Sequence, residues 1–310
     1  MFYSNTANVM DVSTLIPKIL TANTISEILD ISNLDAEFKK ARRIIHPDIC
    51  SHVDAETAFK KLYELNDEWL NGKTYEDESG KYKSNGYVVK FEGDKKLLKL
   101  SLENYNKLKA ARKKDFHHEY LHKYMPKSMK FNGDVLEVEL HARAVPLSEL
   151  ILKYPEVDQK HVNWILSRML EFAALCNQAG YAHMGINLDS IFIIPKDDDY
   201  GHGIQVVSFY HVAAHHTPAK TICGKYKGWY PASLFKDKVP SAMVDMELAK
   251  KTAIYLLGDK SGSGVKFRKT HNKPFMDFVI QQHTDIVTAF KQYRDMLSAN
   301  FEKKFYTLDI

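Results

Sequence analysis

Cysteine is scarce in this sequence of 310 residues, and long apolar runs are absent from it. The three cysteines, Cys50, Cys176 and Cys223, are odd in number, widely separated and without metal-ligand spacing. This usage argues against a disulfide framework and fits a reducing compartment. No stretch approaches the roughly 18 apolar residues of a membrane span, and no basic region followed by an apolar run opens the chain. We therefore expect a cytoplasmic protein that has no contact with membranes.

The net charge of the chain is also small, formally +4 at pH 7. This value alone does not indicate nucleic-acid binding, although its distribution is uneven: residues 95–130 hold eleven Lys and Arg against three acids. The most basic part, "KLKAARKK" at 107–114, is typical of a solvated helix face. Nucleic acid remains a less favoured partner for this stretch.

The hydrophobic pattern changes period along the chain and predicts an α+β protein with two folded parts. Helical spacing begins at Ile25, Ile28 and Leu29, continues through "AEFKKARRII", and returns in "AETAFKKLYELNDEWL", so three helices are expected over 24–70. The polar, glycine-containing stretch that follows predicts a linker or an exposed hairpin. The expected organisation is an extension at 1–23, a helical domain at 24–72, a linker at 73–83, a small strand-rich lobe at 84–147 and a larger helical lobe at 148–310.

Short alternating or apolar runs predict strands in the second part. A long helix closed by Gly180 is expected among them, because glycine favours the left-handed conformation that ends helices. The expected strands are 87–91, 96–101, 135–142, 190–195 and 203–210, and the expected long helix is 161–180.

The tripeptide His46-Pro47-Asp48 follows the second predicted helix. Taken alone it is a helix stop, because proline disfavours helical geometry in the residue before it and Asp48 can form a turn. Its setting, "FKKARRIIHPD" followed by a third helix, resembles the J-domain of DnaJ-type co-chaperones, in which two antiparallel helices display an HPD loop.

The resemblance implies contact with a DnaK-type heat-shock ATPase whose hydrolysis the J-domain stimulates. Asp48, held rigidly by Pro47, would pair with an arginine of the partner, and a cationic helix face would meet an acidic surface. The chain lacks the Gly/Phe-rich stretch and the cysteine-rich zinc repeats of full-length co-chaperones, so an unknown client would bind elsewhere. The residues expected to contact the chaperone are His46, Pro47, Asp48, Lys39, Lys40, Arg42 and Arg43.

The second part resembles the protein-kinase fold over roughly residues 84–300. "LCNQAGYAHMGINLDSIFIIP" and "IQVVSFYHVA" are similar to the catalytic and metal-binding loops, and His183 lies in the first of them. By the same resemblance Lys99 would be the phosphate-contacting lysine on a strand, and Glu119 its partner on the following helix. A structural ion pair between these two is an equally open alternative. Asp245 would begin a buried helix and brace the loop around His183.

The chemistry of a kinase is missing from these loops. Phosphoryl transfer needs a base and oxygen ligands for magnesium. The three corresponding positions are Gly185, Ser190 and Ser208, none of which supplies the expected side chain. The neighbouring Asp189 is displaced by one residue, which is expected to turn it away. We therefore expect a catalytically inactive kinase-like domain with no cofactor, and at most weak nucleotide binding that does not depend on a metal.

An adaptor is the function that these resemblances favour: a J-domain recruits the ATPase, and an inactive kinase-like scaffold selects the client. A viral or mobile-element protein that diverts a host chaperone would fit this combination. The alternatives are an atypical kinase or nucleotide transferase that uses shifted residues, and a basic module that binds nucleic acid or protein. No metal site is expected. Cys176 is assigned to core packing, and the histidines of the region that corresponds to a kinase activation loop are expected to be solvated: His202, His211, His215 and His216.

Overall fold

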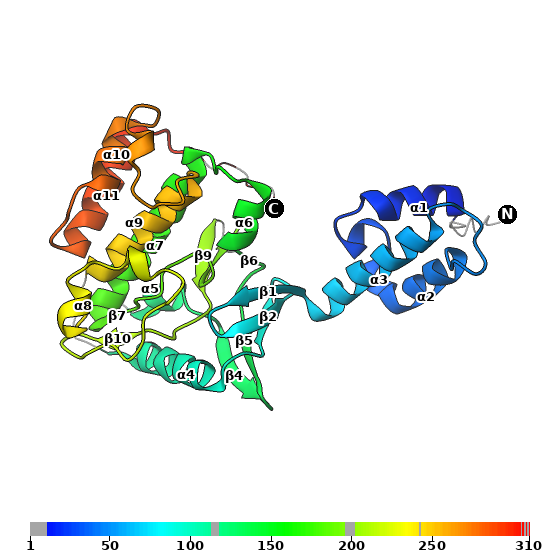
Figure 1. Cartoon of the computed structure of the whole chain (residues 1–310), viewed down its shortest axis with the longest axis horizontal. Helices are drawn as coiled ribbons and strands as arrows, with labels where there is room; N and C mark the ends of the chain where they lie inside the picture. Colours follow the sequence, from blue (N-terminus) through cyan, green and yellow to red (C-terminus); the bar gives the residue numbers. More distant parts are fainter. Residues whose placement is uncertain are drawn as a thin grey trace, which may run out of the picture. The chain divides into compact units, whose positions relative to one another are not determined.

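The computed structural model describes residues 11–112, 118–195, 202–241, 243–304, 306, 308 and 310. The chain has a mixed α+β fold in which helices precede a region containing β-sheet (Figure 1). It divides into two compact units, Met1–Lys73 and Thr74–Ile310. In the described part of the chain, every helix is too short or too polar to cross a lipid bilayer.

In its described residues, 11–73, the first unit is built from three α-helices around one apolar core. The helices are α1 (Val12–Thr21), α2 (Leu34–Ile44) and α3 (Ala55–Asn71), with single 3₁₀ turns at Ile25–Glu27 and Ile31–Asn33. Helix α1 packs along α3, and buried side chains such as Ile19, Phe38 and Leu62 fill the space between the helices. The unit therefore gains most of its stability from helix packing rather than from intrinsic helix propensity.

The structure adds to one expectation for this unit and corrects another. Residues 12–21, expected as part of an extension whose structure the sequence did not indicate, form α1 with Pro17 inside it, because Leu15, Ile16 and Ile19 bury one face of the helix against the core. The helix expected from Ile25 is only a 3₁₀ turn. The Asp30 carboxylate accepts the Ser32 N–H, which is a local turn contact that competes with helix formation.

The second unit begins with a five-stranded antiparallel sheet. Its strands are β1 (Lys73–Asp77), β2 (Gly80–Ser84), β3 (Val88–Phe91), β4 (Ser128–Asn132) and β5 (Val135–Glu139), in the order β1-β2-β3-β5-β4. Helix α4 (Lys95–Ala110) and the short α5 (His118–His122) connect β3 to β4. The predicted strands at 87–91 and 135–142 are thus confirmed as β3 and β5.

Residues 73–83, expected as a linker, form most of the β1–β2 hairpin. The polar composition is misleading because alternation places Tyr82 in the core while its neighbours face solvent. The strand expected at 96–101 is the first half of α4. Leu98, Tyr105 and Leu108 are buried along one helical face, and the Asp94 carboxylate caps the helix by accepting two backbone N–H groups. Six apolar-rich residues did not distinguish a strand from a buried helix turn.

Helices dominate the remainder of the second unit. The predicted long helix is α7, whose C-terminal Gly180 has the expected left-handed conformation (φ 91°). Helix α7 packs against α9 and α11 and supplies much of the core. The elements are β6 (Val145–Pro146), α6 (Leu147–Lys153), α7 (Gln159–Ala179), β7 (Tyr181–Ala182), β8 (Ile191–Ile194), β9 (Gly203–Val206), β10 (Ala213–Ala214), a 3₁₀ turn (Lys227–Trp229), α8 (Leu234–Asp237), α9 (Met243–Leu256), a second 3₁₀ turn (Val265–Phe267), α10 (Lys273–Ile280) and α11 (Ile286–Asn300).

Candidate functional site

The HPD loop leaves the end of α2 and presents its acid to solvent. The Asp48 side chain is 86% exposed, and Pro47 beside it is exposed as well. His46 is held more firmly: its ring packs edge-on against Phe59 at 5.1 Å, and its Nδ1 accepts the Asp48 N–H at 3.2 Å. The loop therefore has an anchored imidazole at its base and a solvent-exposed carboxylate at its tip, with 3.7 Å between His46 Nδ1 and the nearer Asp48 oxygen.

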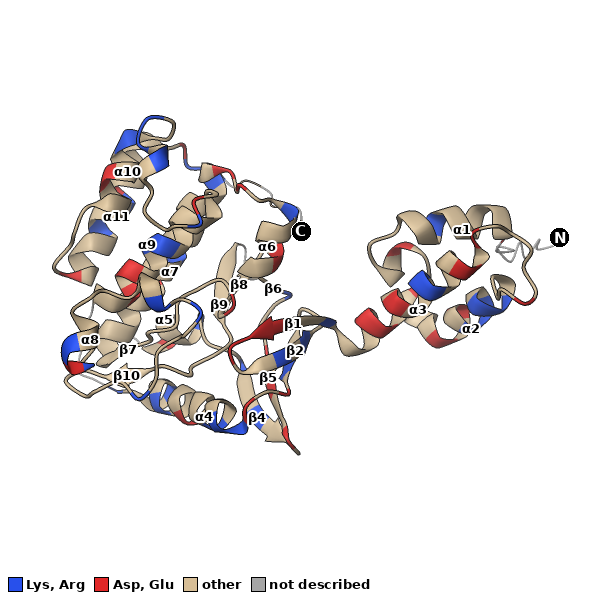
Figure 2. Ribbon diagram, viewed as in Figure 1, with Lys and Arg blue, Asp and Glu red and all other residues tan. Residues whose placement is uncertain are grey.

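The two helices beside this loop run antiparallel. His46 at the end of α2 contacts Phe59, whereas Phe38 near the start of α2 contacts Tyr63, further along α3. Arg42 lies between these contacts and donates to the Tyr63 hydroxyl at 3.3 Å. The side chains of Lys39, Lys40 and Arg43 are exposed on α2, where Figure 2 shows the basic segments in blue. We call Lys39, Lys40, Arg42 and Arg43 the basic face of α2.

In the second unit, a buried acid holds the loop that contains His183. Both Asp245 carboxylate oxygens accept backbone N–H groups, from His183 and from Met184, each at 2.6 Å. Burial raises the pKa of Asp245 to about 6, although these two hydrogen bonds act in the opposite direction. Met184 adopts a left-handed conformation (φ 59°) that costs energy for a residue with a side chain. Asp245 thus stabilises the tight turn at His183 and Met184 through two backbone hydrogen bonds.

The imidazole of His183 joins two loops as a neutral group. Its Nδ1 accepts the Gly185 N–H at 3.2 Å, so its Nε2–H is left to donate to the Ser208 carbonyl at 2.9 Å. The ring packs edge-on against Phe172 and Phe209. Burial lowers the pKa of His183 to about 3. His183 therefore acts as a structural link rather than as a proton carrier at neutral pH.

Helix α4 holds the second of these loops. The Ser101 hydroxyl accepts the Phe209 N–H at 2.9 Å, and the Asn104 amide donates to the Phe209 carbonyl at 2.8 Å. Lys99 lies elsewhere on α4 and is exposed. The hydrogen bond and charge of Lys95 lower the pKa of Asp134, and the charge of Lys99 adds to this effect. The prediction of Lys99 on a strand is wrong, and Glu119 lies on the separate helix α5.

The positions expected to have lost kinase chemistry lie close together. Gly185, Ser190 and Ser208 line one small cavity, which Asp189 also reaches. Ser190 donates to the Gly185 carbonyl, so its hydroxyl serves the fold of the loop. The Asp189 carboxylate faces the segment after β10, where it accepts hydrogen bonds from Lys225 (2.7 Å) and Tyr226 (3.1 Å).

The turn of the β1–β2 hairpin closes over this cavity. Tyr210 donates its hydroxyl hydrogen bond to Asp77 at 2.8 Å, and the Ser79 hydroxyl lies 3.1 Å from the same oxygen. Between them in the turn, Glu78 is paired with His211. Burial raises the pKa of Asp77. The volume that remains is about 10 Å³, roughly that of one water molecule.

One group in this closed region was misjudged from the sequence, and the setting of another could not be read from it. His211 was expected to be solvated, but only 4% of it is exposed, whereas His216 is exposed as expected. Cys223 is buried and lies near His211, a setting that no local motif could indicate because the two come from different loops. Cys176 is buried in α7, as expected for a core residue.

The basic stretch at 107–114 is only partly described, because 113 and 114 lie outside the described residues. Lys107 is exposed at the end of α4, whereas Lys109 donates to the Tyr105 hydroxyl and the Lys127 carbonyl. Arg112 donates to the carbonyl groups that end the helix. Much of this charge therefore stabilises the C-terminal end of a helix, where cations are favoured.

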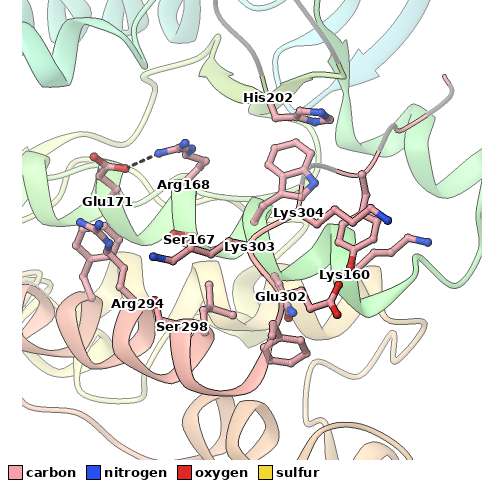
Figure 3. Close-up of a pocket in the computed structure, with 16 residues that line it drawn as sticks. Lys160, Ser167, Arg168, Glu171, His202, Arg294, Ser298, Glu302, Lys303 and Lys304 are labelled. Carbon is pink, nitrogen blue, oxygen red and sulfur yellow. Dashed lines mark hydrogen bonds and ion pairs between the residues drawn. The ribbon is translucent and has the colours of Figure 1, made fainter.

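A larger pocket of about 530 Å³ lies between α7, α11 and the C-terminal segment (Figure 3). In Figure 3, Arg168 and Glu171 form an ion pair at 3.0 Å along one wall. Basic side chains outnumber acidic ones among the lining residues, which include Lys160, Asn163, Trp164, Ser167, Arg168, Glu171, His202, Phe290, Arg294, Ser298, Glu302, Lys303, Lys304 and Tyr306. The pocket is separate from the Gly185 cavity and shares no lining residue with it.

No protein-family model and no curated protein sequence matches this chain. Function therefore has to be argued from the arrangement of its own residues.

Proposed function

We propose that the first unit is a J-domain that recruits and stimulates a DnaK-type ATPase, and that the second unit is a kinase-like scaffold that binds a client protein without transferring phosphate. The single observation that carries the proposal is the exposed Asp48 carboxylate at the tip of two antiparallel helices. An acid that only ended a helix would have no need of the anchored histidine and rigid proline beside it.

The contacts of the loop suit recognition by a charged partner. A carboxylate on a rigid turn loses little conformational freedom on binding, and a charge-assisted contact with arginine is stronger than one between neutral groups. His46 contributes from behind, because its Nδ1 accepts the Asp48 N–H. Replacing either residue should therefore impair the same contact.

The basic face of α2 supports an acidic partner surface. Lys39, Lys40 and Arg43 are exposed on this helix next to the loop. Charges at the rim of an interface speed association and orient the partner more than they add to the final affinity. The basic face of α2 would thus speed association, whereas Asp48 would stabilise the complex once it has formed.

Two features of the second unit support a scaffold rather than a kinase. Gly185, Ser190 and Ser208 offer neither a base nor carboxylate ligands for magnesium, and phosphoryl transfer depends on both. The β1–β2 turn also fills the adjacent space, where a cavity of about 10 Å³ cannot admit a nucleotide. The client of this scaffold would have to bind elsewhere on the unit.

The test is the steady-state ATP hydrolysis of a DnaK-type partner with and without this protein. We expect stimulation by the wild type, and a loss of at least about tenfold in Asp48→Asn and in His46→Gln, equivalent to about 1.4 kcal/mol or more. Circular dichroism should show that both variants stay folded.

The same loop contains a matched control. The Asp54 N–H donates to His52 Nδ1 at 3.1 Å, the same local contact that Asp48 makes with His46, but without a proline between the two residues. Asp54→Asn and His52→Gln should therefore keep full stimulation. Equal activity of the two pairs of variants, or no stimulation by the wild type, would rule out the J-domain assignment.

A further inference from the structure

Three metal-ligating side chains converge in the second unit from distant parts of the chain. Glu78 lies in the β1–β2 turn, His211 follows β9, and Cys223 lies in the segment after β10. Their ligand atoms all lie within 4.8 Å of one another, and the imidazole and the thiol are buried. A thiolate, an imidazole and a carboxylate form a donor set typical of Zn²⁺ sites.

We propose that Glu78, His211 and Cys223 bind one Zn²⁺ ion, which fastens the β1–β2 turn to the helical part of the second unit. The site differs in kind from the proposed chaperone contact and does not depend on it. Its role is structural, because the ion would lie among the three ligand atoms and the adjoining cavity of about 10 Å³ has room for one water molecule but for no substrate.

The hydrogen bonds around His211 direct one of its nitrogens toward this position. Thr221 can donate its hydroxyl proton to the Tyr210 carbonyl at 3.2 Å, and in the tautomer that carries the proton on Nδ1 its oxygen accepts from His211 at 2.9 Å. The lone pair of the neutral imidazole is then on Nε2, which faces the Glu78 carboxylate. Two acceptors in contact require either a proton or a cation between them. Fixing of the outer ring nitrogen by a neighbour is also common among histidine ligands.

Cys223 is supported in a similar way. Burial raises the pKa of the Cys223 thiol to about 12, and a hydrogen bond from the Tyr226 backbone N–H acts in the opposite direction. A bound metal ion would have to displace the thiol proton, and the Tyr226 N–H would then stabilise the metal-bound thiolate. The Cys223 N–H donates to the Tyr230 hydroxyl at 3.0 Å, and that hydroxyl donates to the Met184 carbonyl at 2.6 Å. The sulfur is therefore positioned by the same network that holds the His183 loop.

A fourth ligand from the protein is not needed. Asp77 is the nearest further carboxylate of the turn, and its oxygens accept hydrogen bonds from Ser79 and Tyr210. A single water molecule, for which the cavity has room, would complete a tetrahedral site. Three ligands and one water give the ion a fixed place and leave Asp77 in its present contacts.

The test uses the full chain after treatment with a chelator, titrated with Co²⁺ as a spectroscopic probe and with Zn²⁺ in competition. We expect one Co²⁺ per chain, a sulfur-to-cobalt charge-transfer absorption, and its loss when Zn²⁺ is added. Zn²⁺ alone should raise the melting temperature by several degrees, and Mg²⁺ should not.

Variants identify the ligands. Cys223→Ser should remove the charge-transfer absorption, and Glu78→Gln should weaken Co²⁺ binding at least tenfold while keeping the shape of the side chain. Cys50→Ser and His216→Gln, which change a cysteine and a histidine outside the cluster, should leave binding unchanged. Absence of the charge-transfer band in the folded wild type, or its survival in Cys223→Ser, would overturn the proposal.

Discussion

The HPD loop and the closed cavity of the second unit place their polar groups in opposite ways. In the loop, Asp48 and the neighbouring basic face of α2 are directed toward solvent, with few contacts within the chain. In the cavity, Asp77 and Asp189 accept hydrogen bonds from neighbouring donors, and the buried Asp245 does the same beneath the adjoining His183 loop. One region keeps its charges available, and the other uses them to hold its own loops together.

This difference separates two uses of the same residue types. An exposed acid contributes little to folding stability, so replacing it changes the binding of a partner rather than the free energy of unfolding. A buried acid with satisfied hydrogen bonds contributes to stability, and removing it leaves buried donors unpaired. Substitutions in the two regions should therefore change different measurements.

The largest expected effect concerns the basic face of α2. Reversing three exposed charges together, Lys39→Glu, Lys40→Glu and Arg43→Glu, should slow the association of the DnaK-type partner and thereby weaken its binding about a hundredfold at low salt, at somewhat under about 1 kcal/mol for each charge. Binding titrations at increasing salt should show the deficit shrinking, because exposed charges are screened.

A matched control for that variant changes the net charge equally at exposed lysines of the second unit, with Lys236→Glu, Lys260→Glu and Lys269→Glu. Binding should change little in this case. An equal loss in both triple variants would mean that total charge matters and that the basic face has no special part.

The second prediction concerns the acid beneath the His183 loop. Asp245→Ala should lower the free energy of unfolding by about 1–3 kcal/mol, because the His183 and Met184 N–H groups lose their buried acceptor. Urea denaturation measures this, with Asp295→Ala at an exposed helix position as the control. Stimulation of the ATPase should persist at temperatures where the variant is folded. A variant as stable as the wild type would contradict the bracing role of Asp245.

The third prediction uses the pKa values of Asp245 and His183, which burial moves to about 6 and about 3 from their usual 3.8 and 6.5. Between about pH 4 and 6 the unfolded state has lost the Asp245 proton while the folded state retains it, so this group makes stability fall as pH rises. The unfolded state holds the His183 proton that the folded state excludes, so that group makes stability rise. Each contributes up to about 1.4 kcal/mol per pH unit in this window, with opposite sign.

Unfolding measured across this pH range can separate the two contributions. The stability of the wild type relative to Asp245→Asn should fall from pH 4 to 6, and its stability relative to His183→Gln should rise. If wild-type stability relative to both variants changed with pH in the same direction, the folded-state pKa of Asp245 or His183 would not be shifted in the direction that burial favours.

The sequence predicted the parts of this protein that depend on neighbouring residues. Helix α2, the loop that ends it, and α3 follow from apolar spacing, a proline and an acidic residue within a stretch of about forty residues. The Gly180 helix end and strands β3, β5, β8 and β9 follow from equally local patterns.

Features that depend on tertiary contacts were missed. The β1–β2 hairpin has few apolar residues, and its main anchor, Tyr210, lies more than a hundred residues away. The cluster of Glu78, His211 and Cys223 has no spacing that a motif could capture, because three separate loops supply one ligand each. Helix α1 was missed because the residues of 1–23 show no sustained hydrophobic period, and packing against the core stabilises it.

The smallest expected effect is the response of the second unit to nucleotide. Beneath the β1–β2 turn, Ser190 and Ser208 offer no carboxylate to magnesium, and Lys99 lies exposed on α4 instead of facing the cavity from a strand. Because these residues offer few groups that could bind ATP, we expect its concentration to stay at a tenth of its dissociation constant or less. ATP would then stabilise the fold by no more than about 0.1 kcal/mol. The melting temperature should then move by less than about 1 °C, with or without magnesium.

Removing the contact that holds the turn sharpens this prediction. Tyr210→Phe deletes the hydroxyl bonded to Asp77, which should loosen the hairpin without adding any group that binds phosphate. If the turn alone kept nucleotide out, ATP would raise the melting temperature of this variant by several degrees. Magnesium would increase that rise only if the turn covered side chains able to bind the metal. We expect neither, because the missing side chains lie in the loops beneath the turn. Phosphate transfer to the protein or to a generic substrate should likewise stay at background, and a magnesium-dependent shift in either form would show that the cavity retains nucleotide chemistry.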